Sequence, residues 1–345
     1  MTAAALGLAA PAARAVPTQA RRAPEPLVAA GRAGVVEVPG FRVHHLGVTW
    51  SGPARGGEVR VRRRGAWLPW RPVTATDSPT EQGRRALVYV GDGDAYEFRP
   101  AAGAVRPGIH AINTIDGARR AKLAPISRWA GSSYLCRAAW GADESLRFAP
   151  DGAEVFPAEF FPVQTLTVHH TVTTNTDPDP AATVRAIYAF QALPPENFGD
   201  VGYHLLIDQH GAVYEGRWSG TDPLPVFGSG TGGTGMSNGA HVGGFNAGNV
   251  GVALLGDFTA SGPTARAQRT LTNVLALLAA GTGLDPLGTT AYVNPISGDT
   301  ATVPTISGHR DWNATECPGE TFYPSLVQVR ADVAAILGRY PRLAN

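Results

Sequence analysis

Two histidines and one cysteine are the residues of this chain that are best suited to metal chemistry. His169 lies at the end of a strand-like run, whereas His309 and Cys317 lie close together in the segment 308–319. Two imidazoles and one thiolate can hold a zinc ion and leave a fourth position open, which is the pattern of catalytic zinc sites. The three residues are spread over about 140 positions, so their spacing alone gives only a weak signal. The elements around them must show whether the fold brings them together.

The segment that carries these residues alternates strand-like and helix-like patterns, which predicts an α/β domain with a mixed β-sheet flanked by helices. Asp179-Pro180 places a capping residue before a proline at the first helical position, so a helix is expected to begin there. A helix ending near Gly281 and a last helix up to Tyr340 follow from apolar residues at helical spacing. The expected strands are 164–168, 203–207, 212–215 and 250–255, with a glycine-rich surface loop at 219–239.

The preceding region has short alternating runs broken by glycine, which predicts a small all-β, sandwich-like domain. The runs 87–90 and 96–99 flank the turn Gly91-Asp92-Gly93-Asp94, which favours a hairpin. The predicted organisation is a signal-like or disordered segment 1–34, a β-rich domain 35–115, a linker 116–133 and the α/β domain 134–345.

Tryptophans and arginines in the β-rich domain permit two interpretations. Trp50, Trp67 and Trp70 can form a surface that stacks on sugar rings, or they can fill the core of the sandwich. Arg60 and Arg62–Arg64 can meet an anionic polymer or form a solvated strand face. The sequence favours the structural interpretation in both cases.

Composition excludes several classes of protein. The formal net charge of +1 argues against a strongly basic nucleic-acid binder, and two cysteines are too few for a disulfide scaffold. No apolar run of about 18 residues occurs, so no transmembrane segment is expected. The alanine-rich start contains Ala13-Arg14-Ala15-Val16, which resembles a signal-peptidase site but lacks the usual basic beginning. Export is the expectation, and a disordered tail is the alternative.

Several short strings along the α/β segment occur in a characteristic order. They are RAAWGA at 137–142, HHT at 169–171, DVGYH at 200–204, YEGR at 214–217 and GHRDWNATECPG at 308–319. As an ordered set they resemble the peptidoglycan recognition protein and phage-type zinc N-acetylmuramoyl-L-alanine amidase family. The resemblance covers about 200 residues, from Arg137 to Tyr340, and it implies the amidase/peptidoglycan recognition fold.

The resemblance also implies a site and a reaction. The zinc ligands of the family fall on His169, His309 and Cys317, its catalytic tyrosine on Tyr203, and a further catalytic position on Thr315. The implied cofactor is Zn²⁺, and the implied substrate is peptidoglycan with its muramyl peptides. Hydrolysis would separate N-acetylmuramic acid from L-alanine of the stem peptide, and the implied protein is a secreted or cell-envelope monomer.

The neighbours of these residues receive separate predictions. His241, by its family position, and His170, beside a ligand, are candidates for contact with substrate. His204 is expected to point to the opposite face of its strand from Tyr203 and to be structural. Arg310 and Asp311 are expected to form an ion pair that holds the ligand loop.

Three alternatives remain at this stage. A wall-binding receptor could retain the site and turn over poorly, although Tyr203 and Cys317 favour an enzyme. A cysteine hydrolase could use Cys317 with His309. A Cys136–Cys317 disulfide would remove the metal site. The type of stem peptide is not implied, because Trp218-Ser219 and the glycine-rich insertion replace the residue pair that often distinguishes stem types.

Overall fold

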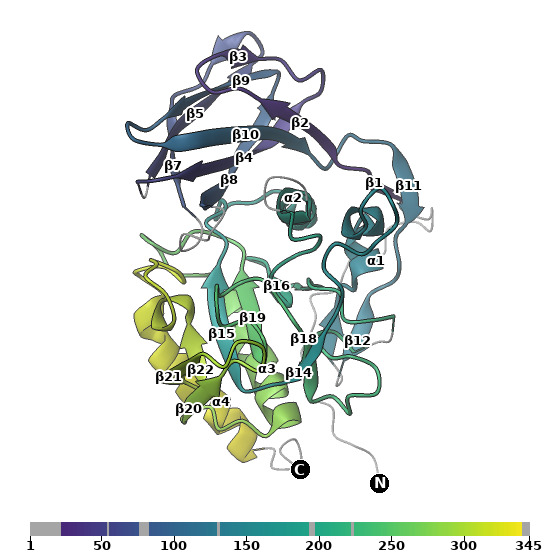
Figure 1. Ribbon diagram of the computed structural model, residues 1–345, viewed down its shortest axis with the longest axis vertical. Coiled ribbons are helices and arrows are strands. Elements are labelled where there is room, and N and C mark those ends of the chain that lie inside the picture. The colour runs from purple at the N-terminus through teal and green to yellow at the C-terminus, as the bar shows by residue number, and fades with distance from the viewer. Residues whose placement is uncertain are drawn as a thin grey trace.

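The computed structural model describes residues 22–53, 55–75, 83–129, 132–192, 197–221 and 224–339. The predicted signal-like sequence at 13–16, the last helical position Tyr340 and the carboxy-terminal residues lie outside this part of the chain. Figure 1 shows a β-rich part formed by the first third of the chain, and an α/β part formed by the rest. No helix among the described residues has the length and apolarity needed to cross a membrane.

The β-rich part is a sandwich of two antiparallel sheets, as the sequence predicts. One sheet has the strand order β2-β10-β4-β8, and the other has the order β3-β9-β5-β6 with β7 also paired to β5. The bounds of these strands are β2 Leu27–Gly31, β3 Val36–Glu37, β4 Val43–Ser51, β5 Arg55–Arg63, β6 Ala66–Trp67, β7 Arg71–Thr74, β8 Arg84–Gly93, β9 Ala95–Pro100 and β10 Val105–Asn113.

The hairpin predicted around residues 91–94 is wrong. β8 pairs with β4, whereas β9 pairs with β5 and β3, so the chain crosses from one sheet to the other at this turn. Alternation of apolar and polar residues shows that a strand has one buried face, but it does not show which strand lies beside it. Both strands bury one face in the sandwich core, so the same pattern fits either connection.

Short strands extend this part beyond its predicted limits. β1 (Arg22–Pro24) pairs with β11 (Arg119–Lys122), and β12 (Ser127–Trp129) pairs with β13 (Ser132–Tyr134). β1 and β2 lie inside the predicted segment 1–34, and β11 and β12 lie inside the predicted linker. Ordered strands are therefore present on both sides of the range 35–115.

The α/β part is built on a mixed five-stranded sheet with the order β17-β16-β19-β15-β22. The central strands are parallel, and β17 is antiparallel at one edge, where it forms the predicted hairpin with β16. The main elements are β15 Thr165–His170, α2 Pro180–Ala192, β16 Leu205–Ile207, β17 Val213–Glu215, β19 Asn249–Leu254, α3 Ala265–Thr282, β22 Ile306–Gly308 and α4 Leu326–Arg339.

Smaller elements complete the part of the chain that the structure describes. They are α1 Arg137–Trp140, a 3-10 turn Glu144–Arg147, β14 Phe160–Pro162, β18 Gly235–Ser237, the hairpin of β20 Thr289–Val293 and β21 Thr300–Pro304, and 3-10 turns at His309–Asp311 and Tyr323–Ser325. β18 pairs with β14, and Val226, Phe227 and Met236 are buried. The glycine-rich insertion is thus anchored in the core rather than a simple surface loop.

Helices cover both faces of the five-stranded sheet. Leu166 and Val168 share a hydrophobic cluster with α3 and α4, whereas Ala253 and Leu206 share a cluster with α2. The Asp179 carboxylate accepts a hydrogen bond from the amide of Ala182 at 3.0 Å, which confirms the predicted start of α2. The residues that alternate with Leu166 and Val168 therefore face the α2 side of the sheet.

Helix α2 lies between the sandwich and the five-stranded sheet, as Figure 1 shows. Nearly all its residues are buried, because the sandwich covers the side that the α/β sheet does not. Leu87 and Ile112 of the sandwich belong to the same hydrophobic cluster as α2. A Cβ atom at Gly47 would lie 2.4 Å from Phe190 of α2, so the helix contacts the strand backbone directly. The two parts share one packed interface.

Polar contacts cross the same interface. The hydroxyl of Thr114 donates to the carbonyl of Ala182 at 2.7 Å, and the Arg185 guanidinium donates to the Thr114 carbonyl at 3.1 Å. His45 Nε2 lies 3.2 Å from the hydroxyl of Thr183, and the imidazole is buried beside Tyr89. Burial, together with the neighbouring His44, lowers the pKa of His45 to about 3, so this imidazole is neutral in the folded protein.

Candidate metal centre

The structure brings the three predicted ligands together. The side-chain donor atoms of His169, His309 and Cys317 all lie within 4.8 Å of one another, and all three residues are buried. His169 is near the carboxyl end of β15, and His309 follows β22 directly. Because these strands are parallel neighbours, with Val168 opposite Gly308, the two histidines emerge side by side. Residues that are far apart in the sequence are therefore neighbours in the sheet.

The loop that carries Cys317 is held by hydrogen bonds to its own backbone. Arg310 N donates to the carbonyl of Cys317 at 3.1 Å, and the amide of Cys317 donates to the hydroxyl of Thr315 at 3.2 Å. Asp311 accepts a hydrogen bond from the amide of Gly308 at 2.7 Å and another from the Tyr323 hydroxyl. These contacts hold the loop close to the end of β22, so that the thiol of Cys317 lies next to His169.

The predicted ion pair between Arg310 and Asp311 is wrong. Arg310 pairs instead with Glu320 at 3.0 Å and also donates to the carbonyl of Glu316. Neighbouring residues in a 3-10 turn point in different directions, so each side chain reaches a different partner. Both residues nevertheless hold the loop.

His241 fixes the orientation and the tautomer of His169. The Nε2 atom of His241 lies 2.9 Å from the carbonyl oxygen of Asn249, which can only accept, so this nitrogen carries the proton. Its Nδ1 atom therefore accepts from Nε2 of His169, at 3.0 Å. The lone pair of His169 is then on Nδ1, 3.7 Å from the sulfur of Cys317. A hydrogen-bond relay from the backbone thus presents the correct nitrogen to a metal.

This relay requires close packing at one glycine. A Cβ atom at Gly251, on β19, would lie 2.7 Å from three atoms of the His241 ring. His204 packs beside His241 and accepts a hydrogen bond from the amide of Gly251 at 2.9 Å, while its Nε2 lies 2.6 Å from the Ser237 carbonyl. Burial lowers the pKa of His204 to about 4. These contacts confirm that His204 is structural.

His169 and His241 are neutral. Burial and the neighbouring imidazoles hold the pKa values of His169 and His241 well below the usual 6.5. A neutral imidazole is the form that binds metals, so the environment favours coordination over protonation. The backbone amide of His170 donates to the Cys317 sulfur at 3.4 Å, a contact that favours the thiolate.

The two residues predicted to bind substrate are bonded within the protein. His170 Nδ1 accepts from the amide of Phe258 at 3.1 Å, and both ring nitrogens of His241 are used in the relay. Both side chains are buried. Their contact with substrate stays a prediction, whereas a positioning role for His241 follows directly from the relay.

Tyr203 lies beside the ligands. Its ring centroid is 5.2 Å from that of His169, and its backbone carbonyl accepts from the amide of Arg217 at 2.8 Å. The amide of the preceding Gly202 donates to the side chain of Gln191 on α2 at 3.0 Å. The tyrosine is therefore fixed from both the sheet and the helix. Thr315 contacts the cluster through the amide of Cys317, as described above.

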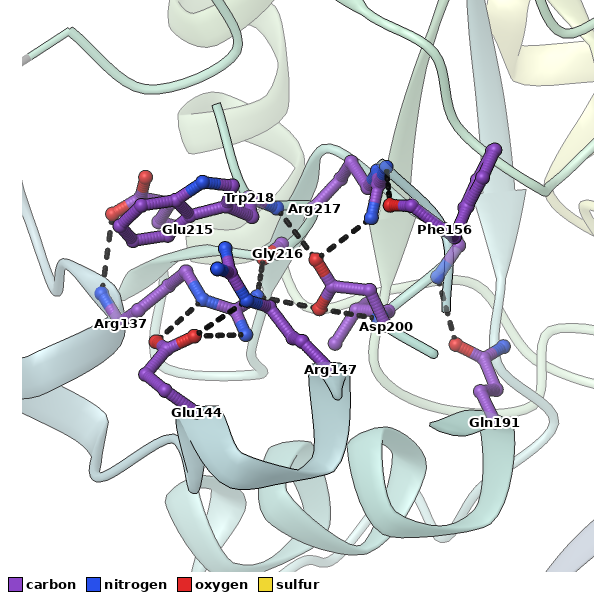
Figure 2. A network of polar contacts seen from close by, with 12 residues as sticks. Arg137, Glu144, Arg147, Phe156, Gln191, Asp200, Glu215, Gly216, Arg217 and Trp218 are labelled. Atoms are coloured by element: carbon purple, nitrogen blue, oxygen red, sulfur yellow. Dashed lines mark hydrogen bonds and ion pairs between the residues drawn. The ribbon is translucent and has the colours of Figure 1, made fainter. Parts of the chain in front are cut away.

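A buried ionic network that was not predicted from the sequence supports the Tyr203 turn. Figure 2 shows that Asp200 accepts from Arg137 at 2.7 Å and from Arg217 at 3.1 Å. The amides of Val201 and Trp218 also donate to Asp200, each at 2.8 Å. A carboxylate with four donors fixes the backbone just before Tyr203. The signal was visible as charged residues within the strings at 137–142, 200–204 and 214–217.

The remaining predictions about cysteines and tryptophans have clear outcomes. No disulfide joins Cys136 and Cys317. Trp50 is in the core, as expected, and Trp140 is also buried. Trp67 and Trp70 are half-buried, and the guanidinium of Arg60 lies 4.6 Å and 4.5 Å from their ring centroids. The indole rings therefore stack on an arginine of their own sheet.

Residues 159–320 match a family model described as N-acetylmuramoyl-L-alanine amidase. The α/β domain belongs to this family. The amidase-family domain is 29% identical over 178 residues to a peptidoglycan recognition protein of Trichoplusia ni, an alignment that covers 50% of this chain and 79% of that protein. It is 30% identical over 174 residues to a human N-acetylmuramoyl-L-alanine amidase, covering 48% of this chain but only 24% of the relative.

One solved structure is also similar to part of this chain. The crystal structure of Drosophila peptidoglycan recognition protein SD aligns at 27% identity over 56% of this chain and 91% of that one, with a TM-score of 0.40. All three candidate ligands and Tyr203 lie inside the matched range 159–320 of the amidase-family domain. The amino-terminal sandwich, strands β2 to β10, lies wholly outside that range.

Proposed function

We propose that the amidase-family domain is a zinc-dependent N-acetylmuramoyl-L-alanine amidase. It would hydrolyse the amide bond between the lactyl group of N-acetylmuramic acid and L-alanine of the peptidoglycan stem peptide. The observation that carries this proposal is the buried group of His169, His309 and Cys317 beside Tyr203. Names of relatives include both amidases and recognition proteins, so the site rather than the names must distinguish cutting from binding.

The donor set fits zinc. Zinc–nitrogen bonds of about 2.0–2.1 Å and a zinc–sulfur bond of about 2.3 Å place the two donor atoms about 3.6 Å apart in a tetrahedral site. The distance between Nδ1 of His169 and the sulfur of Cys317 is 3.7 Å. Two neutral imidazoles and one thiolate are typical zinc ligands, and three protein ligands leave a fourth position for chemistry.

Each residue around the site then has a definite task. A zinc ion held by these three residues would supply an activated water and polarise a carbonyl group. Tyr203, fixed by its backbone contacts, would donate a hydrogen bond to the oxygen on which negative charge develops. His241 keeps Nδ1 of His169 unprotonated, and the hydroxyl of Thr315 holds the backbone of Cys317 in place.

The proposed substrate also bears on where in the cell the protein acts. The wall polymer lies outside the cytoplasmic membrane, so we propose that the protein is exported to the cell envelope or secreted, and that it acts as a monomer. The alanine-rich sequence with Ala13-Arg14-Ala15 supports export.

Mass spectrometry of the soluble products from purified peptidoglycan tests the proposal. We expect intact stem peptides with a free amino group on L-alanine, loss of this product with a chelator, and its return with zinc. A Cys317→Ser protein should lose both metal and product. An active, metal-retaining Cys317→Ser protein, or activity that withstands chelation, would refute the zinc mechanism, and the latter would favour a cysteine hydrolase. Binding to the wall without release, with zinc confirmed in the protein, would favour a receptor.

A further inference from the structure

The net charge of +1 is the sum of two large and opposite charges. Residues 1–133 carry 19 lysines and arginines against 9 acidic residues, a formal charge of +10, whereas residues 134–345 carry 10 against 19, a formal charge of −9. One arginine of the sandwich, Arg85 on β8, is buried with its guanidinium 4.6 Å from the ring centroid of Phe198. The other arginines of strands β2 to β10 are at least partly exposed. The sandwich therefore presents positive charge to solvent.

The positive charge is concentrated at one corner of the sandwich. Five arginines and no acidic residue lie between positions 60 and 71. Arg60 pairs with Glu97 and Arg62 with Asp94, each at 2.6 Å. Within the described part of the chain the other three have no carboxylate partner, and we call them the arginine surface: Arg63, Arg64 and Arg71. They come from the end of β5, the turn after it and the start of β7, which pairs with β5.

Two members of the arginine surface are held by backbone carbonyl groups of the other sheet. The guanidinium of Arg71 donates to the carbonyl of Tyr89 at 2.9 Å. The guanidinium of Arg63 donates to the carbonyls of Val90 and Asp92, each at 3.2 Å. A carbonyl oxygen fixes the position of a guanidinium but leaves its positive charge uncompensated. The two charges are therefore placed side by side on β8 before any ligand binds.

Arg64 occupies a position where arginine is an unfavourable choice. Arg64 and Gly65 form the two-residue turn between β5 and β6, with φ angles of 50° and 82°. Positive φ at both positions is typical of a type I′ turn, for which Asn-Gly is the preferred pair. Arg64 is exposed, so packing does not account for its presence. Backbone strain that packing does not explain is typical of functional positions.

We propose that the arginine surface binds an anionic polymer of the cell envelope whose repeating charge is a phosphodiester. Guanidinium groups bind phosphate oxygens through paired N–H donors, and several on one surface match a chain of repeated charges. The choice of an envelope polymer rests on the proposed location of the protein. The surface itself lies outside the amidase-family range 159–320, so binding does not require the amidase reaction.

A single-stranded nucleic acid has the same charge but needs a further feature. Its bases stack on aromatic rings of the protein. The half-buried rings of Trp67 and Trp70 lie beside the arginine surface, but both stack on Arg60, and Trp70 also stacks on Arg99. These rings are therefore used by arginines of their own sheet, and the observations favour a polymer without bases.

Titration of the full chain with poly(glycerol phosphate) tests the proposal. The logarithm of the association constant should fall linearly with the logarithm of the salt concentration, with a slope of about −2 to −3 for three phosphate contacts. Oligothymidylate with the same number of phosphates should bind no more tightly. Absence of binding, a slope near zero or tighter binding of oligothymidylate would overturn the proposal. The product assay for the amidase is unaffected by any of these results, so the two proposals fail separately.

Variants then assign the binding to the arginine surface. Arg64→Asn gives the turn its preferred residue, so it should be at least as stable as the wild type, while its salt slope becomes shallower by about one. Adding Arg71→Gln should make the slope shallower by about two in all, and the affinity at low salt should fall by about tenfold or more. An unchanged slope in the folded double variant would overturn the proposal.

Arg106→Asn is the matched control. Arg106 is also exposed, with a φ angle of 49°, and it follows the turn after Pro100. Pro100 lies opposite Gly57, near the start of β5, whereas Arg64 follows the end of that strand. Arg106→Asn should therefore keep the wild-type slope. An equal loss in Arg106→Asn and Arg64→Asn would show attraction to the whole sandwich and would overturn the assignment to one surface.

Discussion

Replacing His241 by leucine removes the acceptor that determines the tautomer of His169. In the native site the proton on Nε2 of His169 has an acceptor at 3.0 Å. In His241→Leu the metal-free ring can move its proton to Nδ1, next to the sulfur of Cys317, 3.7 Å away. Zinc binding then requires the proton to return to Nε2, where it is buried without an acceptor.

The size of the effect follows from that unpaired group. His169 is completely buried, so an unsatisfied N–H there costs about 1–3 kcal/mol. Because this cost arises only when zinc binds, the zinc affinity should fall by about fivefold to a hundredfold. The stability of the metal-free protein should change much less, since leucine fills most of the same volume.

Competition with a chromophoric chelator measures the zinc dissociation constant directly. His210→Leu is a matched control, because His210 is exposed in the turn before β17 and lies outside the relay. Urea unfolding of each metal-free protein separates metal affinity from folding. A folded His241→Leu protein whose zinc affinity stays within twofold of the wild type would refute the tautomer argument.

Three further predictions concern catalysis, acid stability and the domain interface. Tyr203→Phe should keep its zinc and lower kcat by about 10²–10³-fold, and an unchanged kcat would exclude the phenol from the reaction. Burial holds the pKa of His45 near 3 in the folded protein against 6.5 when unfolded, so its contribution to stability is present above pH 6.5 and is lost as the pH falls. That loss should be about 2 kcal/mol between pH 7 and pH 5, and urea titrations of His45→Gln should show a smaller drop than the wild type. Gly47→Ala places a methyl group against Phe190 and should lower the free energy of unfolding by about 1–3 kcal/mol, whereas Gly262→Ala, in open space, should not.

Local patterns were sufficient to predict most individual elements of the α/β domain. The start of α2 at Asp179-Pro180 and the β16–β17 hairpin follow from capping and turn residues that act within a few positions. The ligand set was predicted through the resemblance, because no local pattern connects His169 with His309. The parallel register of β15 and β22 provides that connection.

The sequence alone did not predict how elements that are far apart in the chain pack against one another. The prediction of a hairpin at 91–94 was wrong. Apolar and polar residues alternate in the same way whether two successive strands pair with each other or lie in different sheets. Arg85 gave no signal, since a charged residue in a strand normally indicates a solvated face. Its burial depends on a helix about 100 residues later in the chain, whose outer side is also apolar.

The position of α2 also determines how the molecule can come apart. This helix is the middle layer between the sandwich and the five-stranded sheet, so its amide hydrogens reach solvent only when one of the two sheets moves away. Hydrogen exchange along residues 182–192 would therefore report on separation of the domains. A fragment beginning near residue 134 would expose the apolar outer side of α2 and would be expected to self-associate. We therefore expect the amidase-family domain of this protein to need the sandwich in order to stay monomeric in solution.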